Sequence, residues 1–160
     1  MPSPEKRELL QAIAPTLKAA GFKKKDATWH RVRDGIIQTF NVQGSAWGKS
    51  FYLNLGIYLT ALGDETTPPE YRCHIRTRVC RLTDDRARYD ELLDMENSVP
   101  NDTRFRELND IIASKAIPWL EDLSEVQGIK AWLSREKPAG PISTGVFEHY
   151  GVTPLSKREH

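Results

Sequence analysis

The stretch Phe51–Thr60, with the sequence FYLNLGIYLT, decides the fold class of this chain. Apolar residues recur at every second position, and the positions between them are small, polar or aromatic. A β-strand has this period of two because successive side chains point to opposite faces of the sheet. We therefore expect a strand with two faces: Phe51, Leu53, Leu55, Ile57 and Leu59 on the core side, and Tyr52, Asn54, Gly56, Tyr58 and Thr60 on the other.

Two strand-like segments precede this stretch. Thr28–Arg33 and Ile36–Gln43 are joined by Asp34-Gly35, a dipeptide typical of tight hairpin turns. The next connection contains GSAWGKS, residues 44–50, which looks like a phosphate-binding loop. That motif needs four residues between its glycines and a helix after it, whereas here only three residues intervene and a strand follows. We interpret GSAWGKS as a hairpin connection.

A fourth strand is expected in YRCHIRTRVCRL, residues 71–82. The same period of two places Cys73, Ile75, Thr77 and Val79 on one face. It places a cationic row on the other face: Arg72, His74, Arg76 and Arg78.

Helical signals flank these strands. Ser3-Pro4-Glu5 is typical of a helix start, and helices are expected over residues 84–95, from Thr103 to near Pro118, and after Ser124. The order predicts an α+β fold: a four-stranded antiparallel meander with helices packed on one face, the N-terminal helix first and the others after the sheet. We expect one domain over residues 1–136, followed by a linker and tail, residues 137–160, packed on the domain or fraying from it.

Composition indicates a globular protein, with 39% hydrophobic and 28% charged residues and a net charge of +1. No apolar run is long enough to span a membrane, and the polar start lacks the apolar core of a signal peptide. We therefore expect a cytoplasmic protein with two reduced cysteines. Charge is uneven: residues 1–83 hold thirteen Lys and Arg against seven Asp and Glu, whereas residues 84–125 hold five against twelve.

Several motifs resemble those of an uncharacterised bacterial family, domain of unknown function 4304. They are Leu17-Lys18, Gly21-Phe22-Lys23-Lys24-Lys25, then Trp29 and Arg31, the block Phe51–Gly56, and Ile117-Pro118-Trp119-Leu120. Trp29 stands where the family usually has Phe. The resemblance covers roughly residues 9–133 and implies no established activity. Because some members lie beside polymorphic toxins, it implies a small cytoplasmic immunity-type protein.

The face opposite the core is the candidate partner-binding site: Tyr52, Asn54, Tyr58, Arg72, His74, Arg76 and Arg78, with Thr39, Asn41 and Gln43 beside them. Tyr and Arg commonly anchor protein interfaces. Arginines at two-residue spacing repel one another, which favours an acidic partner across the row. That partner is either another molecule or the chain's own acidic segment 84–125. An ordinary solvated sheet face is the alternative interpretation.

We expect a non-catalytic protein-binding domain, an immunity-type inhibitor that occludes a toxin. The acidic segment 84–125 is the alternative docking surface. A nucleic-acid-binding protein using the Arg/Tyr face is the second hypothesis, and a small enzyme is the third. The triplet Lys23-Lys24-Lys25 lies just after the C-terminus of the expected first helix, where the helix dipole favours cations. Contact with nucleic acid is the alternative interpretation. We identify no catalytic, cofactor-binding or metal-ligating residue.

Overall fold

The structure is a computed structural model that describes residues 2–46, 48–135 and 141–153. Helix α1 (Pro4–Ala19) leads into β1 (Lys23–Lys25), β2 (Thr28–Arg33), β3 (Ile36–Gly44) and β4 (Phe51–Leu59). A connection with short 3-10 helices at Thr60–Leu62 and Glu70–Arg72 precedes β5 (Ile75–Arg78), and another follows it at Val79–Arg81. The chain then forms α2 (Arg86–Leu93), α3 (Asn101–Ile111), a π-helical turn (Ile112–Ala116), α4 (Ile117–Asp122), α5 (Val126–Leu133) and α6 (Thr144–Tyr150).

The described residues form one antiparallel sheet of five strands in the order β1-β2-β3-β4-β5. The α+β class and the meander are therefore confirmed, but the prediction of four strands was wrong. The missing strand is β1, whose Lys23 lies opposite His30 and whose Lys25 lies opposite Thr28. Three consecutive lysines show no apolar alternation, so the strand is defined by its pairing with β2. Asp26, with a φ of 57°, makes the tight turn between the two.

The cationic strand is also shorter than predicted. Only Ile75–Arg78 pairs with β4, with Asn54 opposite Arg78 and Gly56 opposite Arg76. Tyr71 and Arg72 lie in a 3-10 helix before the strand. Helix α3, in contrast, begins earlier than predicted: it starts at Asn101, after an N-cap at Pro100, and not at Thr103.

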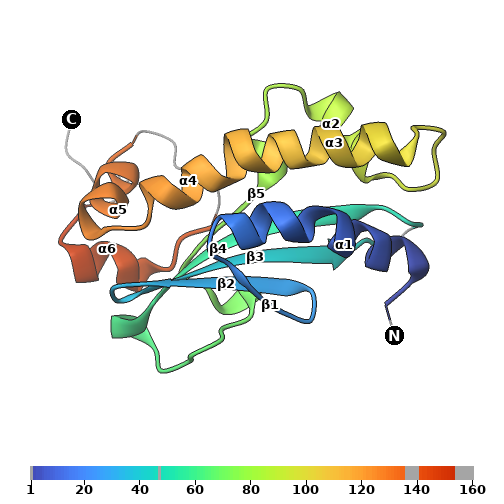
Figure 1. Cartoon of the computed structure of the whole chain (residues 1–160). Coiled ribbons are helices and arrows are strands. Elements are labelled where there is room, and N and C mark those ends of the chain that lie inside the picture. The colour runs from blue at the N-terminus through green and yellow to red at the C-terminus, as the bar shows by residue number, and fades with distance from the viewer. Residues whose placement is uncertain (1, 47, 136–140, 154–160) are drawn as a thin grey trace.

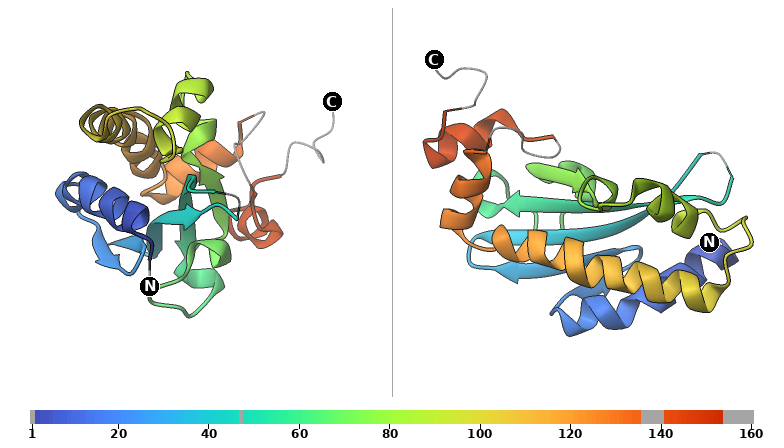
Figure 2. Two further views of the ribbon diagram at one scale, coloured as in Figure 1. Left: turned by 90° about the vertical axis from the view of Figure 1, so that its right-hand side faces the viewer. Right: turned by 90° about the horizontal axis from the view of Figure 1, so that it is seen from above.

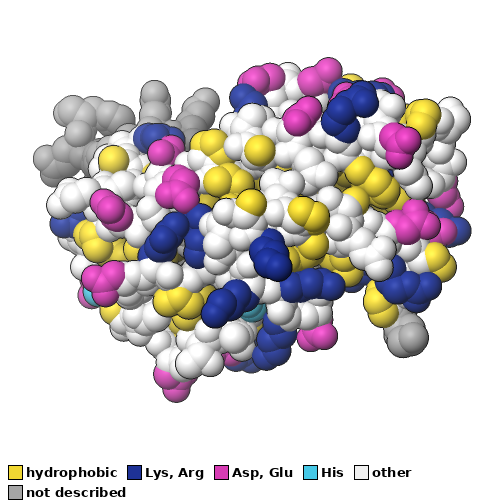
Figure 3. Space-filling model, viewed as in Figure 1, with side chains coloured by type: hydrophobic (Ala, Val, Ile, Leu, Met, Phe, Trp, Pro, Cys, Tyr) yellow, Lys and Arg dark blue, Asp and Glu magenta, His cyan; other side chains and the backbone are white. Residues whose placement is uncertain are grey.

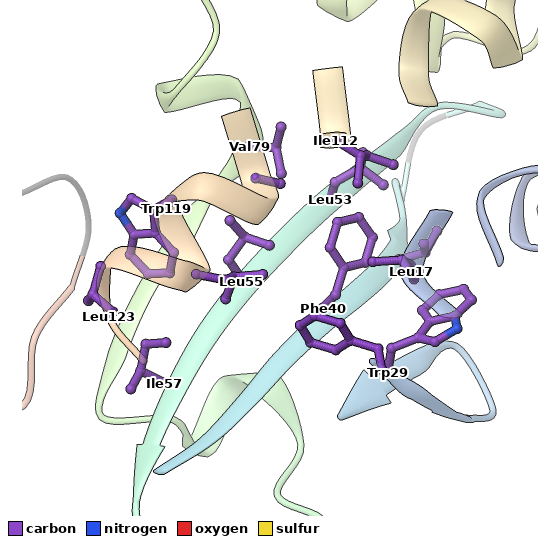
Figure 4. Close-up of a cluster of buried hydrophobic side chains, with 14 of the residues drawn as sticks. Leu17, Trp29, Phe40, Leu53, Leu55, Ile57, Val79, Ile112, Trp119 and Leu123 are labelled. Carbon is purple, nitrogen blue, oxygen red and sulfur yellow. The ribbon is translucent and has the colours of Figure 1, made fainter. Parts of the chain in front are cut away.

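The main core lies between the sheet and the helices on one face. Helices α1 and α3 cover this face, and the connection between β4 and β5 lies on the opposite side (Figures 1 and 2). Leu17 from α1 and Trp119 from α4 meet Phe40 and Leu55 of the sheet in this core (Figure 4). The predicted inward residues of β4 are buried, at 0% exposure for Leu53, Leu55 and Ile57.

One charged group sits inside this core face. Arg31, 4% exposed, donates from Nε and Nη2 to Oε1 of Gln38 on β3, and its Nη1 contacts Glu121 Oε1 at 2.8 Å. Its guanidinium also stacks on the Phe22 ring at 4.7 Å. These contacts pair a buried charge that would otherwise be costly, and they fix β2 to α4.

Candidate protein-binding site

The sheet face opposite the helices is divided by the connection between β4 and β5. The segment 60–73 folds back over one half and buries a small cluster of Ile37, Tyr58 and Cys73. The Tyr58 hydroxyl accepts a hydrogen bond from the backbone N of Glu65 at 3.1 Å. His30 Nε2 lies 2.8 Å from the carbonyl oxygen of Pro68. The segment is therefore tied to the sheet by polar as well as apolar contacts.

Gly56 permits this close cover. A Cβ at Gly56 would lie 2.6 Å from both Cys73 Sγ and Thr39 Oγ1, closer than packed atoms approach. Burial raises the pKa of the Cys73 thiol to about 12, so the group is protonated at neutral pH and acts as a small packing residue.

Two of the three arginines of the predicted cationic row form ion pairs within the chain. Arg72 Nη1 contacts Glu65 Oε1 at 2.9 Å. Arg76 binds Glu70 through two bonds, from Nε at 2.9 Å and from Nη2 at 3.2 Å. The Glu70 hydrogen bond raises the pKa of Arg76. These acids belong to segment 60–73, so the hypothesis that segment 84–125 lies across the row was wrong.

His74 lies near segment 60–73 and contacts the end of β4. Its Nδ1 accepts the backbone N–H of Leu59 at 2.9 Å, and its ring lies 4.7 Å from the Tyr58 ring. Desolvation lowers the pKa of His74. The ring is therefore held neutral with one nitrogen already bonded.

Arg78 differs from its neighbours in the row. Its guanidinium lies over the Tyr52 ring at 4.2 Å, and its Nε donates to Asn54 Oδ1 at 3.2 Å. Among the ion pairs of the described residues, none includes Arg78. A charged side chain is thus oriented by neutral partners.

Asn54 extends this arrangement into a ladder across four strands. Its Nδ2 donates to Asn41 Oδ1 at 3.1 Å and to Gln43 Oε1 at 2.9 Å. Asn41 Nδ2 in turn donates to Thr28 Oγ1 at 2.9 Å. Asn54 is only 3% exposed, so these bonds are sheltered from water. We call Asn41, Gln43, Tyr52, Asn54 and Arg78 the Arg78 strip.

Two small hollows flank Arg78. One, of about 270 Å³, is lined by Tyr52 and Arg78 together with Arg86 and Asp90 of α2. The other, of about 190 Å³, is lined by Asn54, by Arg76, Arg78 and Arg81, and by Glu70. His74 lines neither hollow. Both can hold a side chain of a partner, and neither matches the volume of an ordinary ligand pocket.

The structure brings together Tyr52, Asn54 and Arg78, with Arg76 beside them, and leaves the other predicted site residues elsewhere. Arg76 lies at the border of the smaller hollow with its charge paired. Tyr58 is 4% exposed and Thr39 is fully buried, so the expectation of one continuous solvent-facing surface was wrong. Arg72 precedes the strand, and His74 lies at the covered end.

Sequence reasoning missed the acids that divide the face. Glu65 and Glu70 both lie in the connection directly before the cationic strand. This proximity along the chain is the one signal that pointed to them. Arg81 and Arg86, which line the hollows, lie beyond the strand and carried no alternation signal.

The acidic segment 84–125 forms ion pairs within itself. Arg88 contacts both Glu91 and Glu107, and Arg86 contacts Asp90. Arg104 is 1% exposed, and its Nη1 donates to three backbone carbonyls at the end of α2. Part of this segment's charge is therefore already compensated.

Two other kinds of feature are absent from residues 2–46, 48–135 and 141–153. These ranges contain no group of three or more His, Cys, Asp or Glu side chains that could hold a metal ion. They also contain no helix with the length and apolarity that crossing a membrane requires.

Comparison with known proteins supports the resemblance seen in the motifs. Residues 13–122 match the family model described as domain of unknown function (DUF4304). No match was found among curated proteins or among solved structures. The matched range runs from α1 to the end of α4 and includes every strand of the sheet. The chain therefore belongs to the DUF4304 family.

Proposed function

We propose that this chain is a non-catalytic binding protein that docks an acidic surface of another protein on the Arg78 strip. The observation that carries this proposal is the fixed orientation of Arg78 on Tyr52 and Asn54 without an acidic partner in the described chain. Ordering a mobile side chain on binding costs about 0.5–1.5 kcal/mol. Arg78 is already held by Tyr52 and Asn54 in the free protein, so it would lose less side-chain entropy on binding. This suits it to anchor an interface.

The composition of the strip agrees with this role. Arg and Tyr are enriched among the residues that dominate binding energy, and the exposed amide of Gln43 offers a donor to a partner. The two hollows beside Arg78 can receive side chains of the partner. A carboxylate of the partner in the smaller hollow would lie beside Arg78 and Arg81, and Glu70, which also lines this hollow, is paired with Arg76.

The finer proposal is an immunity-type protein whose partner is a toxin domain. It rests on the implication of the family resemblance and on the exposed cation of the strip. A toxin cleft with catalytic carboxylates would complement Arg78, and occlusion of that cleft would block the toxin without any reaction. The acidic segment 84–125 has less support as the docking surface because several of its acids are paired internally.

Two other functions have less geometric support. Nucleic-acid binding on the Arg/Tyr face would use exposed aromatic rings for stacking. Tyr58 is buried, and the Tyr52 ring, 36% exposed, already has the Arg78 guanidinium over it. For an enzyme, the Cys73 thiol is protonated and His74 is already bonded to the backbone.

The test is affinity capture from nuclease-treated lysate with three baits: wild type, Arg78→Glu and the matched control Arg106→Glu. Arg106 is exposed on α3, away from the strip. All baits must first show cooperative thermal unfolding well above the temperature of the capture. A partner retained by wild type and Arg106→Glu but lost by Arg78→Glu, and cross-linked by a photoreactive residue at Gln43, supports the proposal. A partner retained equally by all three baits refutes the Arg78 strip as its docking surface.

A further inference from the structure

A second cationic surface surrounds β1, at the opposite edge of the sheet from β5, which carries Arg78. A hollow of about 470 Å³ is lined by Lys23, Lys24 and Lys25, by Arg33 of β2 and by the hydroxyl-bearing Thr66 and Thr67. All three lysines are exposed. Lys25 Nζ donates to Thr67 Oγ1 at 3.2 Å, which closes one wall of the hollow.

The cations continue on the other side of β1. A second hollow, of about 560 Å³, lies between the start of α1 and the β1–β2 turn. Lys6, Arg7 and Lys24 line it, so Lys24 borders both hollows. Lys and Arg side chains form a band across α1, β1 and β2 on this face (Figure 3). We call Lys6, Arg7, Lys23, Lys24, Lys25 and Arg33 the β1 basic surface.

The charge of this surface is only partly offset, because Asp26 is the one acid among the described residues that line the two hollows. Among the ion pairs of the described residues, none includes Lys6, Arg7 or a lysine of β1. Arg33 reaches Glu121 only at 3.6 Å, and that carboxylate lies closer to Arg31. Like charges this close repel one another, and an anion from outside the chain would relieve that repulsion.

From these observations we propose that the β1 basic surface binds the phosphodiester backbone of a nucleic acid, independently of base sequence. Lys23 and Lys25 project to the same side of a strand, about 6.6 Å apart, which suits a regularly repeated anion. A continuous band over two hollows suits a long polyanion better than a single carboxylate. Phe22 and Trp29, the nearby aromatic rings, are 3% and 1% exposed, so stacking on bases is not available.

Protection of an edge strand is the competing explanation for the lysines. Lysine at an exposed strand edge discourages pairing with other chains, and no strand among the described residues pairs with the outer edge of β1. That explanation does not account for Lys6 and Arg7 on α1 or for Arg33 on β2. The proposal is also independent of the Arg78 strip, which uses different residues.

Fluorescence anisotropy with a short labelled DNA duplex of mixed sequence tests the proposal. Non-specific binding of this kind has a Kd on the order of 10⁻⁶–10⁻⁴ M, and its affinity falls by about 0.9 log units per contact for each tenfold rise in salt. Removing two contacts with Lys23→Glu/Lys25→Glu should lower affinity by about tenfold to sixtyfold at 0.1 M salt and reduce the salt slope by about two. The control variant Arg106→Glu/Arg135→Glu changes the net charge by the same amount as Lys23→Glu/Lys25→Glu, at two other exposed residues. It should keep most of the affinity of wild type for the duplex.

Each outcome decides for or against the surface. Binding that weakens selectively in the Lys23→Glu/Lys25→Glu variant supports the proposal. If that variant is less stable than wild type, Lys23→Gln/Lys25→Gln replaces it, with a slope reduction of the same size. No binding at low salt, or equal loss in both double variants, overturns it and favours edge protection. Competition by polyglutamate as strong as by duplex would overturn the assignment to nucleic acid.

Discussion

Energetic coupling between Asn54 and Arg78 is the most direct test of the Arg78 strip, because it needs no knowledge of the partner. Asn54→Ala removes three hydrogen bonds, one of them to a charged group. At about 0.5–1.5 kcal/mol for each of the three bonds, the one to the exposed Arg78 included, the expected loss of unfolding free energy is about 1.5–4.5 kcal/mol. Arg78→Ala removes one of these bonds and an exposed cation–π contact, at about 1–2 kcal/mol.

The two losses share the bond between Arg78 Nε and Asn54 Oδ1. The double variant should therefore lose about 1 kcal/mol less than the sum of the single variants. Urea unfolding followed by tryptophan fluorescence measures all four proteins of the cycle. Asn54→Ala combined with Arg106→Ala is the control pair, and its effects should add within about 0.5 kcal/mol because the side chains do not touch.

A coupling energy below about 0.3 kcal/mol for Asn54 and Arg78 would refute the reasoning. It would mean that the bond is not maintained in solution and that Arg78 is as mobile as any surface arginine. The argument that the Arg78 strip is oriented before binding would then lose its basis.

Three further predictions concern the covered half of the face and the buried arginine. Gly56→Ala should lower the free energy of unfolding by about 1–3 kcal/mol, measured by thermal unfolding, because the new Cβ would clash with Cys73. A change near zero would show that segment 60–73 moves away from the sheet without an energetic cost. The pKa of His74 is lowered from its ordinary 6.5, so the unfolded state binds more protons just below that pH and wild type should lose stability as pH falls. His74→Gln should lose less over the same range in urea unfolding, and an identical pH dependence would contradict the buried neutral ring. Arg104→Met should lose at least about 3 kcal/mol, because three carbonyls at the end of α2 lose their donor; near-normal thermal stability would contradict this.

The main fold could be predicted from sequence where burial follows a local period. Leu53, Leu55 and Ile57 alternate because one face of β4 meets the core, and the structure confirms this. Ser3 was also predictable as a helix cap, since its Oγ accepts the backbone N–H of Lys6 at 3.2 Å. Strand β1 could not be predicted, because its three lysines obtain their strand conformation from pairing with β2.

The candidate site was only partly predictable for a different reason. A period of two assigns a side chain to a face, but it does not say what covers that face. Tyr58 and Asn54 point the same way from β4, yet Tyr58 lies under segment 60–73 and Asn54 borders the open half. The contacts of Glu65 and Glu70 depend on how that segment folds back, which no local pattern records.

The division of the face gives the unpaired charge at Arg78 its significance. Glu65 and Glu70 neutralise two arginines, which lowers the repulsion along the row. Asn54 Oδ1 needs only one donor, and a neutral side chain at this position could supply it. An arginine adds a positive charge and terminal nitrogens that Asn54 does not use, and it places them between two hollows. The charge contributes to stability through the cation–π contact with Tyr52, whereas the terminal nitrogens beside the hollows are the groups that the proposed acidic partner would bind.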